Sequence, residues 1–167
     1  MPRPELIDEK TALLSQLRAQ RAHVVGILDE LSDADLRRPV LPSGWSCLGL
    51  VRHLAVDVER FWFRAVVAGE QVGLETGDGG WRVPDDMSGE AVLELYRDEA
   101  ARADAVVEAR ALGAGPAWWP VDVFPDLPVR DLRQTVLAVI VETATHAGHL
   151  DAARELIDGR TWLVLTD

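Results

Sequence analysis

Four long stretches of the chain repeat their apolar residues at the three- and four-residue spacing of an α-helix. Such a stretch buries its apolar face only when another helix packs against it, so four of them favour a helix bundle. The two-residue alternation of a β-strand is absent from the sequence, apart from a short candidate, TWLVL, near the end. The pattern therefore predicts an all-α four-helix bundle. The predicted helices cover residues 5–31, 46–68, 88–112 and 129–158.

Cap residues mark where these helices begin and end. Ser46 and Ser88 begin the second and third helices, and a serine in that position accepts hydrogen bonds from the first free N–H groups. Gly159 follows the fourth helix, where glycine readily takes the left-handed conformation that ends a helix. Residues 32–39 have the sequence SDADLRRP, which predicts a single capped turn that the final proline ends.

Two long loops separate the last three predicted helices. Residues 69–86 are rich in glycine and polar residues, and residues 113–128 contain spaced prolines that exclude a continuous helix. Long loops in compact domains often carry function. With 167 residues, 48% of them hydrophobic, the chain can bury a normal core. We therefore expect a single domain over residues 1–167, with the TWLVLTD end docked on it.

Charge and composition exclude several classes of partner. The formal net charge is −11, and scattered arginines supply all the positive side chains except Lys10. Phosphate backbones bind clustered Lys and Arg, so we expect no nucleic-acid partner. The longest apolar run, residues 136–141, is too short to span a membrane, and the charged N-terminus differs from a signal peptide. With Cys47 as the single cysteine, we expect a cytoplasmic protein without a membrane partner, and a homodimer is compatible with these features.

The fourth predicted helix carries the residues with the clearest chemical meaning. Glu142 and His146 are four residues apart and share one face, and His149 lies three residues further along that face. Their apolar neighbours place this face partly inside the bundle. A carboxylate and an imidazole in the interior need partners, because burying a lone charge is costly, and one divalent cation satisfies both. His53, among apolar residues of the second helix, is the candidate third ligand.

Spacing alone leaves simpler interpretations open for these residues. Glu142 and His146 could form an ordinary ion pair within one helix, and His53 could be a hydrogen-bonded core histidine. The bundle would then be an interaction module without a metal. His149 is either a functional residue, as a donor that orients a ligand or an acid–base group near an open metal position, or a solvent-side histidine at the mouth of the bundle.

Other polar residues also have two interpretations each. Asp57 is either a partner that orients His53 or, more commonly for such a position, a solvated helix residue. Cys47, beside a predicted helix start, is either a reactive thiol or a small buried residue, as free cysteines usually are. His23 is expected to be structural or exposed, and the loop GPAWWP, residues 115–120, could form a wall of the metal pocket. Candidates for holding an anionic group are Arg52, Arg60, Arg64 and Arg82.

Two motifs in the chain resemble those of the DinB-like superfamily. In the segment PSGWSCLGLVRHLA, Gly44, Trp45 and Ser46 precede His53, and the family places a histidine seven or eight residues after a loop of the GWT or GWS type. In ETATHAGHLD a carboxylate stands four residues before a histidine, as in the last helix of the family. The chain most resembles the mycothiol-dependent maleylpyruvate isomerase and thiol S-transferase subgroup, in helix order and lengths over essentially its whole length.

This resemblance implies a metal site with three protein ligands, His53, Glu142 and His146. Many DinB-like proteins present three histidines, whereas the combination of two histidines and a glutamate is associated with the mycothiol-dependent isomerase. The thiol cofactor of that subgroup favours zinc, because zinc suits thiolate ligands. Iron, nickel and manganese remain alternatives, since two histidines and a carboxylate also bind non-haem iron.

The resemblance also implies a reaction. A low-molecular-weight thiol, mycothiol if the host is an actinobacterium, would be activated at the metal and would attack a small electrophilic partner, giving S-transfer or isomerisation. His149 is the candidate catalytic residue beside the metal. The alternative is a non-catalytic, metal-binding stress or interaction protein of the same superfamily, because a shared fold and site do not prove catalysis.

Overall fold

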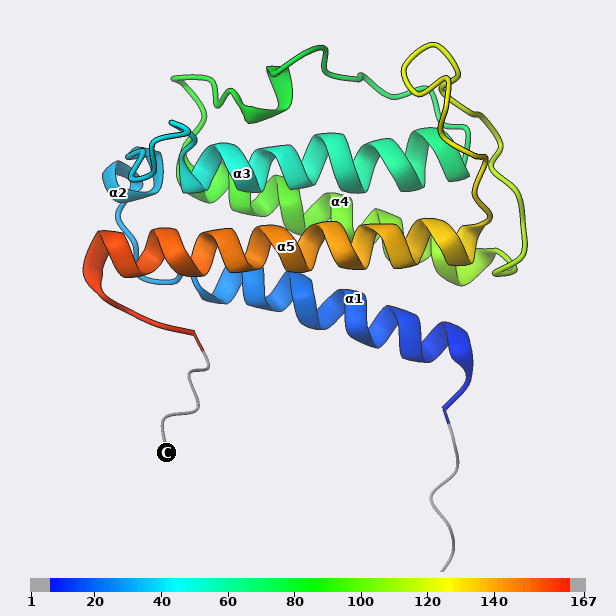
Figure 1. Ribbon diagram of the computed structural model, residues 1–167, viewed down its shortest axis with the longest axis horizontal. Coiled ribbons are helices and arrows are strands. Elements are labelled where there is room, and N and C mark those ends of the chain that lie inside the picture. Colours follow the sequence, from blue (N-terminus) through cyan, green and yellow to red (C-terminus); the bar gives the residue numbers. More distant parts are fainter. Residues whose placement is uncertain (1–6, 163–167) are drawn as a thin grey trace, which may run out of the picture.

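The computed structural model describes residues 7–162, and these residues form a bundle of helices without any strand (Figure 1). The all-α class is therefore confirmed, while the last five residues of the TWLVLTD end lie outside the described residues. The elements are α1 (Glu9–Gly26), α2 (Asp33–Arg37), α3 (Cys47–His53), η1 (Leu54–Val67), η2 (Gly79–Trp81), α4 (Gly89–Ala109) and α5 (Leu132–Asp158). Within this part of the chain, no helix is both long and apolar enough to cross a membrane.

The long helices form two parallel pairs. The helix α3 continues directly into η1, which has the wider π-helical geometry, and together they run in the same direction as α4 (Figure 1). The helices α1 and α5 pack on each other and run in the opposite direction. A chain that leaves one helix and enters a parallel one must travel back along the bundle. Residues 68–88 do this, passing over α3 and η1, and we call them the crossover.

Most helix ends lie where the caps predict. The hydroxyl groups of Ser46 and Ser88 each accept a hydrogen bond from the N–H group three residues later. Gly159 ends α5 with a φ of 78°. The last helix begins slightly later than predicted, because Asp131 and Gln134 form a capping box there.

The first helix is shorter than predicted at its C-terminal end. It ends at Gly26, and residues 27–30 form turns in which Glu30 has a φ of 66°. Ile27 and Leu28 are nevertheless buried. The apolar spacing continues past the helix because these side chains still enter the core. Spacing alone therefore does not distinguish a turn from a helix at these residues.

An ion pair lies inside the largely apolar core. Arg21 of α1 and Glu59 of η1 are both buried, and the guanidinium donates to the two carboxylate oxygens at 2.7 and 2.6 Å. The same guanidinium donates to Asp104 of α4 at 2.6 Å. These contacts join three of the long helices, including the one that continues from the predicted metal ligand His53.

Candidate metal centre

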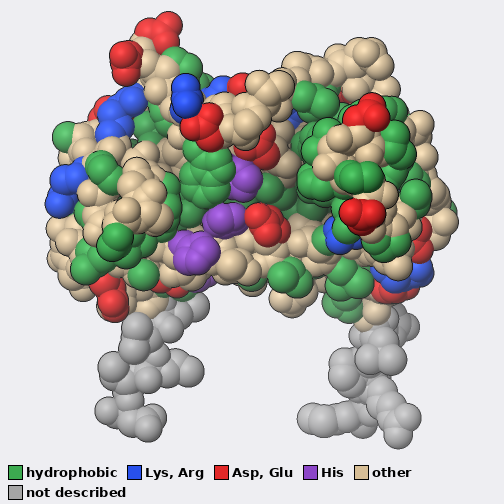
Figure 2. Space-filling model, turned by 45° about the horizontal axis from the view of Figure 1, so that its top comes forward, with side chains coloured by type: hydrophobic (Ala, Val, Ile, Leu, Met, Phe, Trp, Pro, Cys, Tyr) green, Lys and Arg blue, Asp and Glu red, His purple; other side chains and the backbone are tan. Residues whose placement is uncertain are grey.

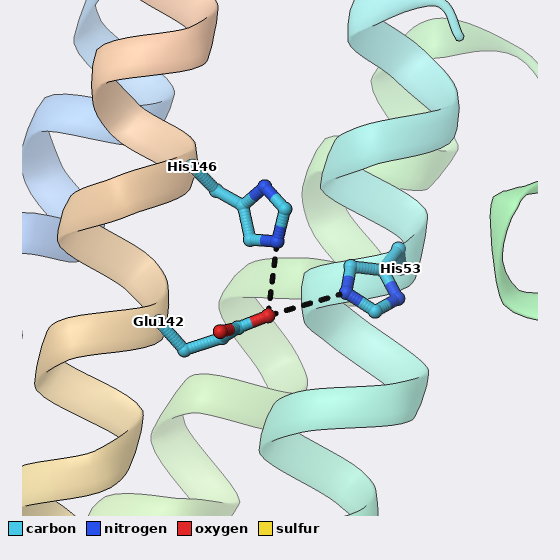
Figure 3. Close-up of side chains that lie close together, drawn as sticks. All are labelled: His53, Glu142 and His146. Atoms are coloured by element: carbon cyan, nitrogen blue, oxygen red, sulfur yellow. Dashed lines mark hydrogen bonds and ion pairs between the residues drawn. The ribbon is translucent and has the colours of Figure 1, made fainter. Parts of the chain in front are cut away.

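The structure brings the three predicted ligands together between α3 and α5. His53 is the last residue of α3, and Glu142 and His146 lie one turn apart on α5 (Figure 3). The Oε1 atom of Glu142 is 3.0 Å from Nε2 of His146 and 3.8 Å from Nε2 of His53. One donor atom from each residue lies within 4.8 Å of the others. Two imidazoles and a carboxylate in this arrangement fit the donor set of a divalent first-row metal.

The two histidines are more shielded than the carboxylate between them. The side chains of His53 and His146 are 15% and 12% exposed, whereas that of Glu142 is 48% exposed. Burial lowers the pKa of His146, and the nearby His53 adds to this effect while Glu142 opposes it. Burial therefore favours the neutral form of His146, which is the form that binds metals. Figure 2 shows histidines beside an acidic side chain in the hollowed middle of this face.

Asp57 orients the ring of His53. Its Oδ2 atom lies 2.8 Å from Nδ1 of His53. A carboxylate on Nδ1 holds the proton there, so Nε2, which faces Glu142, stays free to bind a metal. The crossover fits closely over this pair, since a Cβ on Gly80 would lie 1.8 Å from a carboxylate oxygen of Asp57. Of the two interpretations of Asp57, the structure therefore supports the one in which this residue orients His53.

The crossover closes one side of the site. Trp81 of η2 stacks on the imidazole of His53, with ring centroids 4.3 Å apart and an angle of 14° between the planes. Arg52 donates to the carbonyl oxygens of Gly79 and Gly80 at 2.5 and 3.1 Å, and this holds η2 against α3. Trp81 therefore shields His53 from solvent, a contact that sequence reasoning missed because the residue lies in a loop.

His149 lies at the open edge of the site, outside the cluster of the three predicted ligands. Its side chain is exposed, and its Nδ1 atom is 3.4 Å from Nδ1 of His146. Its ring centroid is 6.2 Å from that of Trp45. This position is compatible with both interpretations of His149, because the residue contacts the predicted ligand His146 and also faces solvent.

Cys47 and His23 take structural positions. Cys47 is buried, and burial raises the pKa of its thiol to about 11, so it is not a reactive nucleophile at neutral pH. The interpretation as a small buried residue is confirmed. The Nε2 atom of His23 lies 2.7 Å from Oδ1 of Asp151, and its ring stacks on Trp162, so His23 belongs to the contact between α1 and α5.

A groove of about 830 Å³ leads away from His53 and Glu142. Phe61 and Trp62 of η1 line it on one side, and Phe124 of the connection between α4 and α5 lines it as well. The wall predicted from GPAWWP is therefore misplaced by a few residues. Its two tryptophans do not line the groove, but they pack against the aromatic rings of η1.

The arginines predicted to hold an anion do not line the groove. Each pairs with a carboxylate, and two of them face Glu99 of α4, away from the groove. The four are Arg52, Arg60, Arg64 and Arg82. The arginine that lines the groove is Arg130, which the sequence analysis missed. Only the fold places it there, because it lies in the loop before α5, far along the chain from Trp62.

Removing the carboxylate behind His53 should weaken metal binding. We expect Asp57→Ala to lower zinc affinity by about 10- to 100-fold, because the ring of His53 loses its orientation and its proton is no longer held on Nδ1. Competition with a coloured zinc chelator measures this. Asp85→Ala, an exposed carboxylate of the crossover, is the matched control. Equal affinities of the two variants would show that Asp57 does not act on the site.

Comparison with known proteins agrees with this fold. A model of the mycothiol-S-transferase family matches residues 12–159. No curated protein matches the chain. Among solved structures, YfiT from Bacillus subtilis, described as a probable metal-dependent hydrolase with an unusual four-helix bundle topology, has a TM-score of 0.67 at 17% identity, over 92% of this chain and 90% of that chain. This likeness confirms the four-helix bundle. Because the family model spans most of the sequence, the chain belongs to the mycothiol-S-transferase family.

Proposed function

We propose that this protein is a metal-dependent mycothiol S-transferase whose metal is held by His53, Glu142 and His146. The observation that carries the proposal is the convergence of their three donor atoms within 4.8 Å. Family membership supports mycothiol as the thiol. Three protein ligands leave a position for a further ligand, as in catalytic zinc sites, and zinc is the first choice, with iron, nickel and manganese as alternatives. A metal bound there lowers the pKa of a thiol by stabilising its anion.

The surrounding residues have separate roles in this proposal. Asp57 keeps Nε2 of His53 available, and Trp81 excludes water from one side of that ring. His149, next to His146 at the open edge, accepts the proton that the thiol releases. Its place beside the centre supports this assignment.

Two outcomes are open to the thiolate sulfur. In S-transfer it forms a bond to an electrophilic carbon, and the leaving group departs with the electron pair of its broken bond. In isomerisation it adds to the substrate and later leaves with the electron pair of the C–S bond, so that the thiol is regenerated when it recovers a proton.

A conjugation assay tests the enzyme. Zinc-loaded protein should accelerate the reaction of mycothiol with monochlorobimane, followed by fluorescence, and glutathione and bacillithiol serve as control thiols. His146→Ala should lose about 100-fold or more of the rate, because the centre is incomplete. Cys47→Ala should keep the full rate, since the buried thiol is not the nucleophile.

Two results would change the proposal. If protein with stoichiometric metal conjugates none of the three thiols, the non-catalytic metal-binding alternative replaces the enzyme. If His149→Ala retains both its metal and its full rate, His149 has no part in the reaction.

A further inference from the structure

Apolar side chains line the groove on two sides. The rings of Phe61 and Trp62 have centroids 5.0 Å apart, and Phe124 stacks on Trp62 at 5.8 Å with an angle of 17°. From α5, Leu137 and Val141 line the groove while remaining 46% and 65% exposed. Exposed apolar side chains around a concave surface are typical of a site for an apolar ligand.

Arg130 brings a positive charge to this apolar groove. Its guanidinium carbon lies 5.7 Å from the centroid of the Trp62 ring, so a cation–π contact helps to orient it. Within the described residues, the nearby Arg133 forms ion pairs with Glu9 and Asp131, whereas Arg130 forms none. Arg130 is therefore available to an anionic group of a ligand.

The charge lies far from the candidate metal centre. Arg130 comes just before α5, which starts at Leu132, whereas Glu142 lies ten residues further along the helix. At 1.5 Å per residue this separates the two ends of the groove by roughly 15 Å along the helix axis. At the metal end the groove is lined by carboxylates, each with a partner: Asp57 with His53, Glu75 with Arg52 and Glu142 with His146.

We propose that the groove binds the electrophilic substrate, and that this substrate is an elongated, apolar or aromatic molecule with a carboxylate or similar anionic group at the end far from its reacting atom. The inference rests on the proposed function, which places the reaction at the metal end. The apolar body would pack on Trp62 and Phe124, and the anion would pair with Arg130. A second cleft of about 550 Å³, which Trp81 also borders and which Ser43 and Arg82 help to line, is left for the polar thiol.

Two matched probes test this assignment. The molecules 4-phenylbutanoate and 4-phenylbutanamide share one apolar body and differ in charge. In titration calorimetry with zinc-loaded protein, the carboxylate should bind about tenfold more tightly than the amide. Arg130→Gln should remove this preference, while Arg82→Gln, in the second cleft, should keep it. A carboxylate that binds the metal instead would not respond to Arg130→Gln.

A second pair of variants tests whether the apolar side chains of α5 that line the groove contact the ligand. Leu137→Glu places a carboxylate in the groove and should weaken 4-phenylbutanoate binding about tenfold or more. Leu156→Glu, at an exposed position of the same helix outside the groove, should have no effect.

Three results would overturn the assignment: equal affinity for the two probes, a preference that survives Arg130→Gln, or direct competition between mycothiol and 4-phenylbutanoate. Competition would show that the thiol occupies the groove. Each measurement is of binding alone, so it separates this inference from the outcome of the conjugation assay.

Discussion

Protein purified without chelator should contain close to one divalent metal ion per chain, and His146→Ala or His53→Ala should lose most of it. Each substitution removes one of three donor atoms that lie within 4.8 Å of one another. The two remaining ligands then form an incomplete site. We expect the affinity for zinc to fall by about 100-fold or more. This loss is larger than the one expected for Asp57→Ala, which removes a residue that only orients a ligand. Elemental analysis and competition with a zinc chelator measure occupancy and affinity.

Two other histidines provide the controls for this prediction. His23→Ala should keep its metal, because His23 pairs with Asp151 at the contact between α1 and α5. His149→Ala should also keep it, since His149 lies outside the cluster of three donors. Circular dichroism confirms that each variant is folded. Full occupancy in both His146→Ala and His53→Ala would remove the proposed site.

Arg21→Met should lower the free energy of unfolding by about 3–5 kcal/mol. The substitution keeps an apolar side chain of similar length, but it leaves the buried carboxylate of Glu59 without the guanidinium that now donates to both of its oxygens. A buried charge without a counter-charge beside it is far more costly than an exposed one. Urea unfolding followed by circular dichroism measures the change.

Two variants separate charge from packing. Arg18→Met breaks the ion pairs of an exposed arginine with Asp104 and Glu108 and should cost less than about 1 kcal/mol. The double variant Arg21→Met/Glu59→Leu removes both buried charges and should recover much of the lost stability. If Arg21→Met lowers the free energy of unfolding by no more than Arg18→Met does, the expected contribution of the buried pair to stability is wrong.

Local chemistry explains why so much of the fold could be predicted. Apolar periodicity gives the long helices, and the N-cap hydroxyls of Ser46 and Ser88 act within three residues of their own position. The same is true of part of the site, because residues four apart on a helix share a face whatever surrounds it. Glu142 and His146 were therefore predictable as a pair. Where burial continued beyond a helix, as at Ile27, the same pattern predicted a helix that is too long.

The tertiary structure alone decided the rest of the site. The sequence by itself determined the helices and the pair of candidate ligands on α5, since these depend on contacts within one or two turns. Three features of the site bring together segments that are distant along the chain. They are the approach of His53 to Glu142, the stacking of Trp81 on His53 and the position of Arg130 in the groove. The stacking of Trp81 on His53 follows from the parallel order of α3 and α4, which makes the crossover travel back over α3, whereas the other two depend on how α5 packs against α3 and η1. Apolar periodicity specifies which face of a helix is buried, but it does not specify the direction of the helix that covers it.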